Sequence, residues 1–386
     1  MTSEDTATTP NPLTSIIQEA IRQSPDQAIT LAQYMELALY HPQHGYYQQS
    51  RPAPGRTGDF LTSPEASPYF GLTVARQLIE IWDRLGQPGA WEIREFGAGT
   101  GVLAYDILAG IAHDAPEAIA GLRYRLVESN PFRRKEAMAA MTEAGLADRI
   151  VISDSFDPLP AFSGVLLGNE VADAFPAHRL VVRDGALREM YVVAQGNGFG
   201  WQEGDRSDAT AHLTEVEALA RSLPDAALLD VSPAAAIWFE QAAALLEHGL
   251  ALIIDYGYPT VELYASHRLE GTLRAYRGQQ VTDDPFLEPG AYDLTTHVDF
   301  TELQQAGMRS GLEPAGFMKQ GEFLERLGMG MFLVDLQQEP DMTAEDYLAA
   351  KAAIIRLVEP GGLGRFGVLG MTRGIELDPP LTGFRR

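Results

Sequence analysis

The 386-residue chain carries 53 acidic and 29 basic side chains, and its formal net charge of −24 argues against nucleic acid as a partner because a polyanion would be repelled. Cysteine is absent, which excludes disulfides, thiolate nucleophiles and zinc–thiolate sites. With 45% apolar residues, the length allows one large domain or two ordinary ones with a hydrophobic core.

The N-terminal region predicts a helical cap followed by a loop. Apolar residues recur at helical spacing over residues 13–21, and a second helical stretch runs from about 30 to 40 before Pro42 ends it. Residues 45–68 are dense in glycine and proline, and a loop of this length without secondary structure is expected to be either functional or mobile. We therefore expect residues 1–66 to form a helical cap with a lid loop.

The rest of the chain alternates short apolar runs with helical stretches. The runs are residues 91–96, 124–128, 149–153, 165–168 and 250–256, with a last candidate strand at 366–371. This alternation predicts an α/β fold with a doubly wound, mostly parallel sheet. The pattern breaks at about residues 178–230, where three short strands separated by Asp184-Gly185 and Asn197-Gly198 predict a β-rich insertion between the fourth and fifth strands.

No apolar run approaches the roughly 18 residues that a membrane-spanning helix requires. The first residues, from Met1 to Thr6, lack the basic region of a secretion signal and the arginine-rich pattern of a transit peptide. We therefore expect a cytoplasmic protein without a membrane span.

A glycine-rich turn follows the strand at 91–96 and opens a helix. It reads Glu95-Phe96-Gly97-Ala98-Gly99-Thr100-Gly101, and Val102 stands where a dinucleotide fingerprint has its third small residue. The spacing is typical of the first motif of class I S-adenosylmethionine-dependent methyltransferases, in which the turn lies against the methionine part of the cofactor. The alternative is an ordinary tight turn of another α/β protein.

Polar residues also end the next three strands. Glu128 is placed to accept ribose hydroxyls, Asp154 and Ser155 to contact adenine, and Asn169 to line the same crevice, because parallel strands present their carboxyl ends to the ligand. A solvated Glu128 and a turn-capping Asp154 are the structural alternatives. The expected residues for S-adenosylmethionine are Gly58, Glu95, Gly97, Gly99, Gly101, Glu128, Asp154, Ser155 and Asn169.

On these motifs and several others the sequence resembles the MidA-type methyltransferases, a bacterial and mitochondrial family that includes a complex I assembly factor with protein-arginine methyltransferase activity. The further motifs are Tyr40-His41-Pro42-x-x-Gly45-Tyr46-Tyr47, Gly58-Asp59-Phe60-x-Thr62-Ser63-Pro64-Glu65, Asn169-Glu170-x-x-Asp173-Ala174-x-Pro176, Asp255-Tyr256-Gly257 and Asp293-x-Thr295-x-His297-Val298-Asp299-Phe300. The resemblance implies a Rossmann-like class I methyltransferase domain over residues 67–386. It implies S-adenosylmethionine as cofactor and, as acceptor, an arginine of a protein, which is a complex I subunit in the mitochondrial member.

One stretch departs from the family pattern. Where the family often has a longer Arg-Gly-rich segment before His297, this chain has Tyr276-Arg277-Gly278-Gln279 and an acidic Asp283-Asp284. We expect this departure to affect substrate recognition and to leave the methyltransferase core unchanged.

Four residues are candidates for the chemistry of methyl transfer. A guanidinium is protonated at physiological pH, so carboxylates that bind this group would orient it and offset its positive charge. Glu170 and Asp173 suit this role; Asp59 lies in the lid loop with Gly58 as hinge, and His297 could form an acid–base pair with Asp299. The alternatives are a helix cap for Asp173, a local turn for Asp59 and a hydrogen-bonding role for His297. Asp299 reads best as a helix N-cap.

Other functions stay open at this point. A methyltransferase for a small molecule, a complex I assembly chaperone that binds the cofactor without turnover, and a nicotinamide-dependent dehydrogenase are the competitors, the last disfavoured by Val102. His41 and His44 lack a third ligand nearby, so no metal site is expected. The insertion at 178–230 could serve a homodimer or a substrate.

Overall fold

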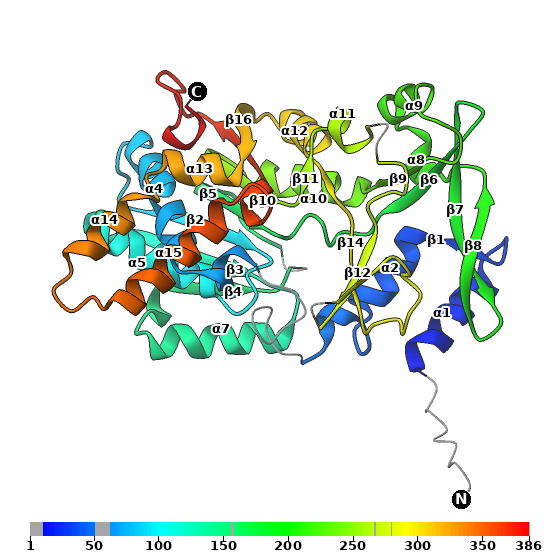
Figure 1. Ribbon diagram of the computed structural model, residues 1–386, viewed down its shortest axis with the longest axis horizontal. Coiled ribbons are helices and arrows are strands. Elements are labelled where there is room, and N and C mark those ends of the chain that lie inside the picture. The colour runs from blue at the N-terminus through cyan, green and yellow to red at the C-terminus, as the bar shows by residue number, and fades with distance from the viewer. Residues whose placement is uncertain (1–10, 51–61, 156–157, 266–267, 279, 386) are drawn as a thin grey trace, which may run out of the picture. The chain divides into compact units, whose positions relative to one another are not determined.

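The computed structural model describes residues 11–50, 62–155, 158–265, 268–278 and 280–385 (Figure 1). It divides into two compact units. The first holds the chain up to Gln49 together with Pro176–Pro233 and Tyr264–Thr296, and the second holds Ser50–Phe175, Ala234–Leu263 and His297–Arg386. Gly58 and Asp59, two of the expected site residues, lie outside the described residues.

A seven-stranded sheet forms the centre of the second unit, in the order β16-β17-β10-β5-β2-β3-β4. Its strands are β2 (Trp91–Phe96), β3 (Leu122–Val127), β4 (Ile150–Ser153), β5 (Phe162–Asn169), β10 (Leu246–Asp255), β16 (Glu313–Lys319) and β17 (Gly367–Arg373). The first five are parallel, and β17 and β16 complete the sheet in antiparallel pairing. The chain moves from β2 outward to β4 and then returns to β5 on the other side of β2. The predicted doubly wound, mostly parallel sheet is confirmed, and its switch point lies between β2 and β5.

Helices cover both faces of this sheet because the apolar side chains of its buried strands point alternately to one face and the other. In β10, Leu250, Leu252 and Ile254 join the apolar core on one face, and Ala251 and Ile253 join the core on the other. The helices α4 (Tyr69–Arg84), α5 (Val102–Asp114) and α7 (Pro131–Glu143) contribute to the first core, and α10 (Pro233–Ala244) and α12 (Phe300–Arg309) to the second.

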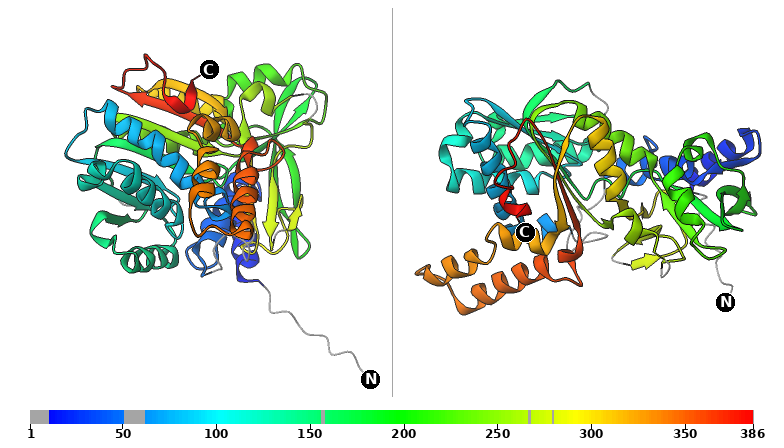
Figure 2. Two further views of the ribbon diagram at one scale, coloured as in Figure 1. Left: turned by 60° about the vertical axis from the view of Figure 1, so that its left-hand side comes forward. Right: turned by 90° about the horizontal axis from the view of Figure 1, so that it is seen from above.

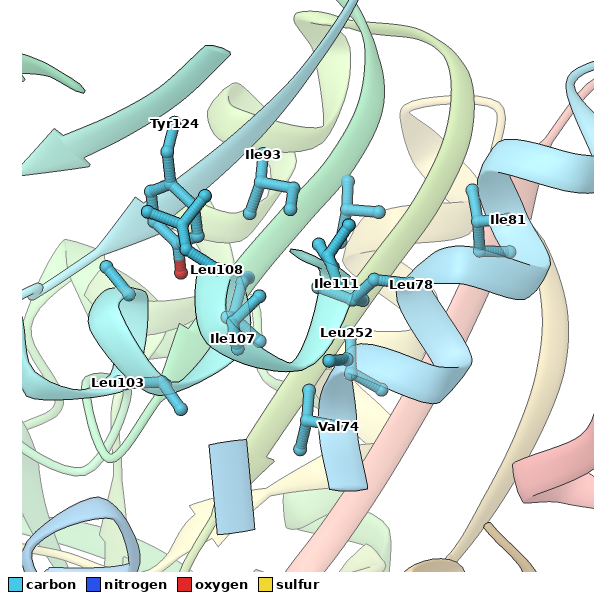
Figure 3. Close-up of a cluster of buried hydrophobic side chains, with 14 of the residues drawn as sticks. Val74, Leu78, Ile81, Ile93, Leu103, Ile107, Leu108, Ile111, Tyr124 and Leu252 are labelled. Carbon is cyan, nitrogen blue, oxygen red and sulfur yellow. The ribbon is translucent and has the colours of Figure 1, made fainter. Parts of the chain in front are cut away.

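The close contact of α4 with α5 depends on small residues. Figure 3 shows Val74 and Leu78 of α4 beside Ile107 and Ile111 of α5. A Cβ atom added to Gly110 of α5 would lie 2.8 Å from the Cβ atom of Ala75, so only glycine permits this approach.

The first unit combines the N-terminal helices with the β-rich insertion. Its main sheet has the order β1-β7-β6-β9, with β8 paired to β7, and a small sheet has the order β13-β12-β14. The elements are α1 (Pro12–Gln23), β1 (Ala28–Thr30), α2 (Leu31–Tyr40), β6 (His178–Arg183), β7 (Ala186–Gln195), β8 (Gly198–Gly204), α8 (Asp208–Ala211), α9 (Thr214–Ala220), β9 (Leu228–Val231), β12 (Arg274–Arg277), β13 (Gln280–Thr282) and β14 (Asp293–Thr295). Because β1 pairs with β7, the helical cap and the insertion expected as separate parts share one sheet.

The two hairpin turns of the insertion follow their glycines. Asp184 and Gly185 both have positive φ, at 51° and 75°, as a two-residue primed turn requires. The second turn lies one residue earlier than the sequence suggested, at Gly196-Asn197, because Gly196 takes the positive φ of 57° and Gly198 already belongs to β8.

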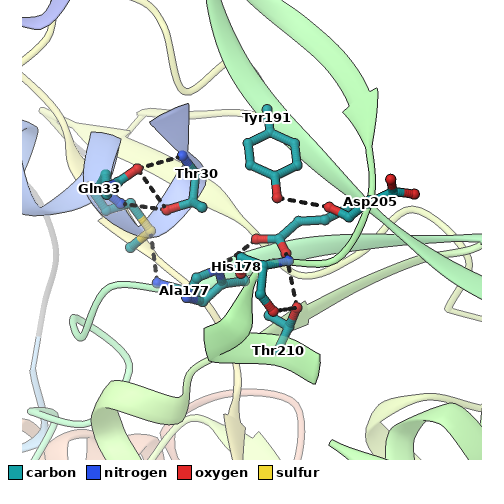
Figure 4. A network of polar contacts seen from close by, with 10 residues as sticks. Thr30, Gln33, Ala177, His178, Tyr191, Asp205 and Thr210 are labelled. Atoms are coloured by element: carbon teal, nitrogen blue, oxygen red, sulfur yellow. Dashed lines mark hydrogen bonds and ion pairs between the residues drawn. The ribbon is translucent and has the colours of Figure 1, made fainter. Parts of the chain in front are cut away.

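A buried polar network links β6 and β7 of this sheet to the start of α8 (Figure 4). The side chain of Glu189 is fully buried, and its carboxylate lies 2.7 Å from His178 Nδ1 and accepts hydrogen bonds from Ser207 N (2.7 Å) and Thr210 Oγ1 (2.9 Å). Burial raises the pKa of Glu189, but the hydrogen bonds from His178 and Ser207 outweigh burial and leave that pKa below its usual range.

The remaining elements of the second unit are short, except for a helical hairpin. Figure 2 shows α14 and α15 as this hairpin. The elements are α3 (Ser63–Ala66), α6 (Pro116–Ala120), β11 (Gly257–Tyr258), α11 (Thr260–Leu263), β15 (Val298–Asp299), α13 (Gln320–Arg326), α14 (Met331–Gln338) and α15 (Ala344–Val358). Among the described residues, no helix combines the length and the apolar character needed to cross a bilayer.

The packing of α5 on the sheet yields a stability prediction. Ile107 is fully buried, so Ile107→Ala should lower the free energy of unfolding by about 2–5 kcal/mol through lost burial and a residual cavity. Tyr105→Ala, at a position of the same helix that is 49% exposed, should cost much less. Urea unfolding of both variants checks this, and equal losses would contradict the packing described.

Candidate active site

The glycine turn between β2 and α5 forms the floor of the site. Gly97, Gly99 and Gly101 have φ values of 68°, 55° and 82°, in the left-handed region that favours glycine. A Cβ atom on Gly97 would come within 2.9 Å of Val171 Cγ2, whereas one on Gly99 would meet no atom of the described residues within 4 Å. The turn is therefore packed on one side and open at Gly99, where a ligand could approach the backbone.

Glu128 joins this turn to the end of β3. One carboxylate oxygen accepts a hydrogen bond from Gly99 N (2.8 Å), and the other accepts one from Asn130 N (2.7 Å). Burial raises the pKa of Glu128, and these two hydrogen bonds oppose that effect. Each carboxylate oxygen has a second lone pair, so the arrangement leaves acceptors for two hydroxyl groups.

Glu95 lies on β2, two residues before Gly97. Its carboxyl group is buried and accepts a hydrogen bond from Tyr124 Oη at 2.7 Å. Burial raises the pKa of Glu95 to about 8 even though the Tyr124 hydroxyl opposes that shift. The hydrogen bond from Tyr124 thus ties Glu95 to the core. The expected role of Glu95 in cofactor binding stays a prediction.

Arg134 organises the end of β4. Its guanidinium forms an ion pair with Asp154 (2.9 Å) and donates to the backbone oxygens of Glu128 (2.6 Å) and Ser129 (2.9 Å). Asp154 is half-buried and Ser155 is exposed. Arg134 therefore ties Asp154 to the strand end that carries Glu128, a link that the sequence did not reveal.

The end of β5 carries the most unusual backbone of the site. Glu170 has a φ of 51°, which is uncommon for a residue with a side chain and indicates strain that its surroundings must offset. Its carboxyl group accepts hydrogen bonds from Ser63 N (3.0 Å) and Asn169 Nδ2 (3.1 Å). Burial raises the pKa of Glu170 to about 8, and the negative charge of Asp255 adds to the rise.

Asp173, the other expected acid, lies three residues further on. It is half-buried in a turn, and no helix begins at Ala174, so the helix-cap alternative is wrong. The backbone of this turn is bound by Asp255, the last residue of β10, which the sequence placed at a strand end without a role.

His297 and Asp299 take different roles. His297 packs edge-on against Tyr256, with ring centroids 4.2 Å apart. Asp299 caps α12 by accepting from Thr301 N (3.0 Å) and Glu302 N (3.2 Å), and it also accepts from Thr260 Oγ1 (2.8 Å). The N-cap interpretation of Asp299 is confirmed. The acid–base role of His297 stays a prediction.

The residues that the sequence missed differ in the signal that could have revealed them. Asp255 ends a parallel strand, as Glu128 and Asn169 do, so the rule used for the other strands would have found it. Ser63 gave a weaker signal as part of the lid motif, because its contact with Glu170 spans 107 positions in sequence. Among the described residues, no cluster of three or more acidic or histidine side chains could hold a metal ion.

Comparisons with known proteins agree with this geometry. Residues 73–318 match a family described as "Putative S-adenosyl-L-methionine-dependent methyltransferase". The chain is 29% identical to the Drosophila melanogaster protein arginine methyltransferase NDUFAF7 homolog, mitochondrial, over 92% of this chain and 85% of that protein. It is 26% identical to the Homo sapiens protein arginine methyltransferase NDUFAF7, mitochondrial, over 86% and 78%.

Two solved structures from Burkholderia thailandensis share the fold over nearly the whole chain. One, with S-adenosyl-homocysteine bound, has a TM-score of 0.84 and 29% identity, and a native structure has 0.85 and 30%; each match covers 97% of this chain and 94% of that one. The predicted Rossmann-like methyltransferase fold and S-adenosylmethionine as cofactor are thereby confirmed. The open face at Gly99 and the carboxylate of Glu128 fit that cofactor.

The link between Glu128 and the turn predicts a binding defect. Glu128→Gln replaces one acceptor oxygen with an amide nitrogen, which donates and cannot accept, so S-adenosylmethionine should bind at least about tenfold more weakly. Glu143 is exposed at the end of α7, so Glu143→Gln removes the same charge away from the turn and should bind S-adenosylmethionine normally. Isothermal titration calorimetry measures both, and equal affinities would argue against Glu128 as a cofactor residue.

The buried carboxyl of Glu95 predicts a pH-dependent stability. Because burial raises its pKa in the folded protein to about 8, above the ordinary 4.5, the folded state holds this proton more tightly than the unfolded chain. The contribution of Glu95 to stability is therefore present below pH 4.5 and lost as the pH rises to about 8. In Glu95→Gln this loss should be absent, so the variant should gain thermal stability over wild type between pH 5 and 8. A difference in melting temperature that is independent of pH would contradict this.

Proposed function

Because the chain belongs to the MidA-type family of S-adenosylmethionine-dependent methyltransferases, we propose that it transfers the methyl group to an arginine side chain of a protein. A guanidinium has five N–H donors and no acceptor, so it is complementary to a site made of acceptors. The acceptor groups at the end of β5 are the observation that supports this choice most directly.

These acceptors lie together on two neighbouring residues. Asn169 Oδ1 is buried and accepts no hydrogen bond from any of the described residues, although its amide nitrogen donates to Glu170. A buried acceptor without a donor costs about 1–3 kcal/mol, which a bound donor would recover. Glu170 supplies a carboxyl group in the same place, and a group with donors only would satisfy both side chains.

Glu170 can also balance the protons of the reaction. When bound, S-adenosylmethionine supplies an electrophilic methyl group. The arginine nitrogen that gains this methyl must lose a proton, and we assign the Glu170 carboxylate as the group that accepts it. Its pKa of about 8 in the free enzyme suits a base that works near neutral pH, and a bound guanidinium would favour its ionised form.

The relatives support the same acceptor class. Those from Drosophila melanogaster and Homo sapiens carry the name protein arginine methyltransferase, and the net charge of −24 would attract a basic partner. Their names also place those two proteins in mitochondria, so they give no support to a cytoplasmic location. That location, a homodimer and a complex I subunit as acceptor stay predictions.

Replacement of Glu170 provides the direct test. Glu170→Gln should lower the rate of arginine methylation by about 10²-fold or more, because the amide keeps the shape but cannot take the proton. The exposed Glu325→Gln of α13 carries the same charge change and should retain activity. Each purified variant is incubated with labelled S-adenosylmethionine and an extract of cells that lack this enzyme. The extract proteins are then hydrolysed, and the amino acids are analysed for labelled methylarginine.

The outcomes separate the alternatives. Label in a metabolite and none in arginine would indicate a small-molecule methyltransferase. Binding of the cofactor without any transfer would indicate the assembly chaperone.

In wild type, kcat/KM should rise with pH through an apparent pKa of about 8, because Glu170 must lose its proton before it can act as a base. A flat profile would exclude this residue as the base.

A further inference from the structure

Asp255 has an unusual set of contacts for a strand-end carboxylate. Its side chain is fully buried, and Oδ2 accepts hydrogen bonds from three successive backbone groups, Val171 N (3.1 Å), Ala172 N (2.8 Å) and Asp173 N (3.3 Å). Oδ1 accepts from its own neighbour, Tyr256 N, at 2.7 Å. The segment that Asp255 binds is the one that follows Glu170.

This segment needs an external support. Glu170 has the left-handed φ of 51°, a conformation that a residue with a side chain adopts at a cost of about 1–3 kcal/mol unless its surroundings hold it. Glu170 N donates to Ile254 O (2.8 Å), the residue before Asp255. The end of β10 therefore holds both sides of the bend, Glu170 by a carbonyl group and residues 171–173 by a carboxylate.

From these contacts we propose that Asp255 is a positioning residue for methyl transfer, whose carboxylate holds residues 171–173 so that Glu170 and Asp173 are fixed toward the methyl acceptor. The proposal rests on the proposed function, because it assigns Asp255 a task in the reaction of that site. Asp255 contacts neither the acceptor nor the cofactor in this scheme and acts through the bend.

The packing of the bend makes a loose arrangement costly. Val171 lies against the cofactor turn, since a Cβ atom on Gly97 would come within 2.9 Å of its side chain. On the other side, Ser63 N donates to Glu170. A bend released from Asp255 would shift Glu170 between these two neighbours, and a misplacement of about 1 Å can reduce a rate by about 10²-fold.

Asp255 also acts on Glu170 through its charge. The groups that influence Glu170 are Asp255 on β10, Glu65 on α3, Asn169 beside it and the amide of Ser63. Burial is the main cause of the raised pKa of Glu170, and the negative charge of Asp255 raises that pKa further. Removal of this charge should move the pKa of Glu170 downward, an effect that a purely mechanical support would not have.

The test compares two strand-end aspartates of the same unit, of which Asp255 is fully buried and Asp299 is half-buried. Asp255→Asn leaves an amide that cannot accept from all four N–H groups, and Asp299→Asn makes the same change at the N-cap of α12. For Asp255→Asn we expect a cofactor affinity within about threefold of wild type, a kcat lowered by about 10²-fold, and a pH profile of kcat/KM displaced to lower pH. For Asp299→Asn we expect a lower melting temperature with a normal pH profile. Asp255→Glu, which keeps the charge but lengthens the side chain, should retain the wild-type pH profile with a reduced kcat.

Amide hydrogen exchange gives a readout that needs no acceptor. Exchange at Val171 and Ala172 should accelerate in Asp255→Asn and stay slow in Asp299→Asn. Wild-type turnover, or unchanged exchange at these amides, would overturn the proposal. If wild-type enzyme methylates a metabolite and no arginine, the proposed function fails, while the same variants assayed on that metabolite still decide the role of Asp255.

Discussion

The pairing of β5 with β2 is the constraint on which the site depends. Because the chain leaves β2 in one direction and returns to β5 on its other side, the strand ends that carry Gly97, Glu128, Asn169 and Asp255 all meet at one edge of the sheet. At a switch point no helix crosses directly from one strand to its neighbour, so the backbone of the glycine turn can stay open to a ligand. The two apolar cores on the faces of this sheet therefore also help to hold these candidate site residues together.

The same edge concentrates carboxyl groups that are buried or half-buried. Glu95, Glu170 and Asp255 are all held with pKa values raised above their ordinary ones, chiefly by burial. Each has hydrogen-bond donors, which keeps the desolvation cost tolerable: Tyr124 for Glu95, Ser63 and Asn169 for Glu170, and four backbone amides for Asp255. Perturbed acids and a strained backbone in one place are typical of catalytic sites, where stability is sacrificed for reactivity.

The first unit is held together in a different way. Its sheet is assembled from segments far apart in sequence, with β1 from the N-terminal region paired to β7 of the insertion. The buried Glu189 is satisfied by His178, Ser207 and Thr210, so polar groups specify how the insertion closes on itself.

The sequence by itself determined the local structure and the cofactor. Strand–helix alternation, the Gly97–Gly101 turn and the acids at strand ends follow from side-chain periodicity and backbone conformation, which are properties of neighbouring residues. Only the tertiary structure decided which side chains hold one another: Asp255 on residues 171–173, Ser63 on Glu170, Arg134 on Asp154, and β1 beside β7. These contacts join residues whose spacing carries no periodic signal, because strand order and loop closure, rather than local propensity, bring them together.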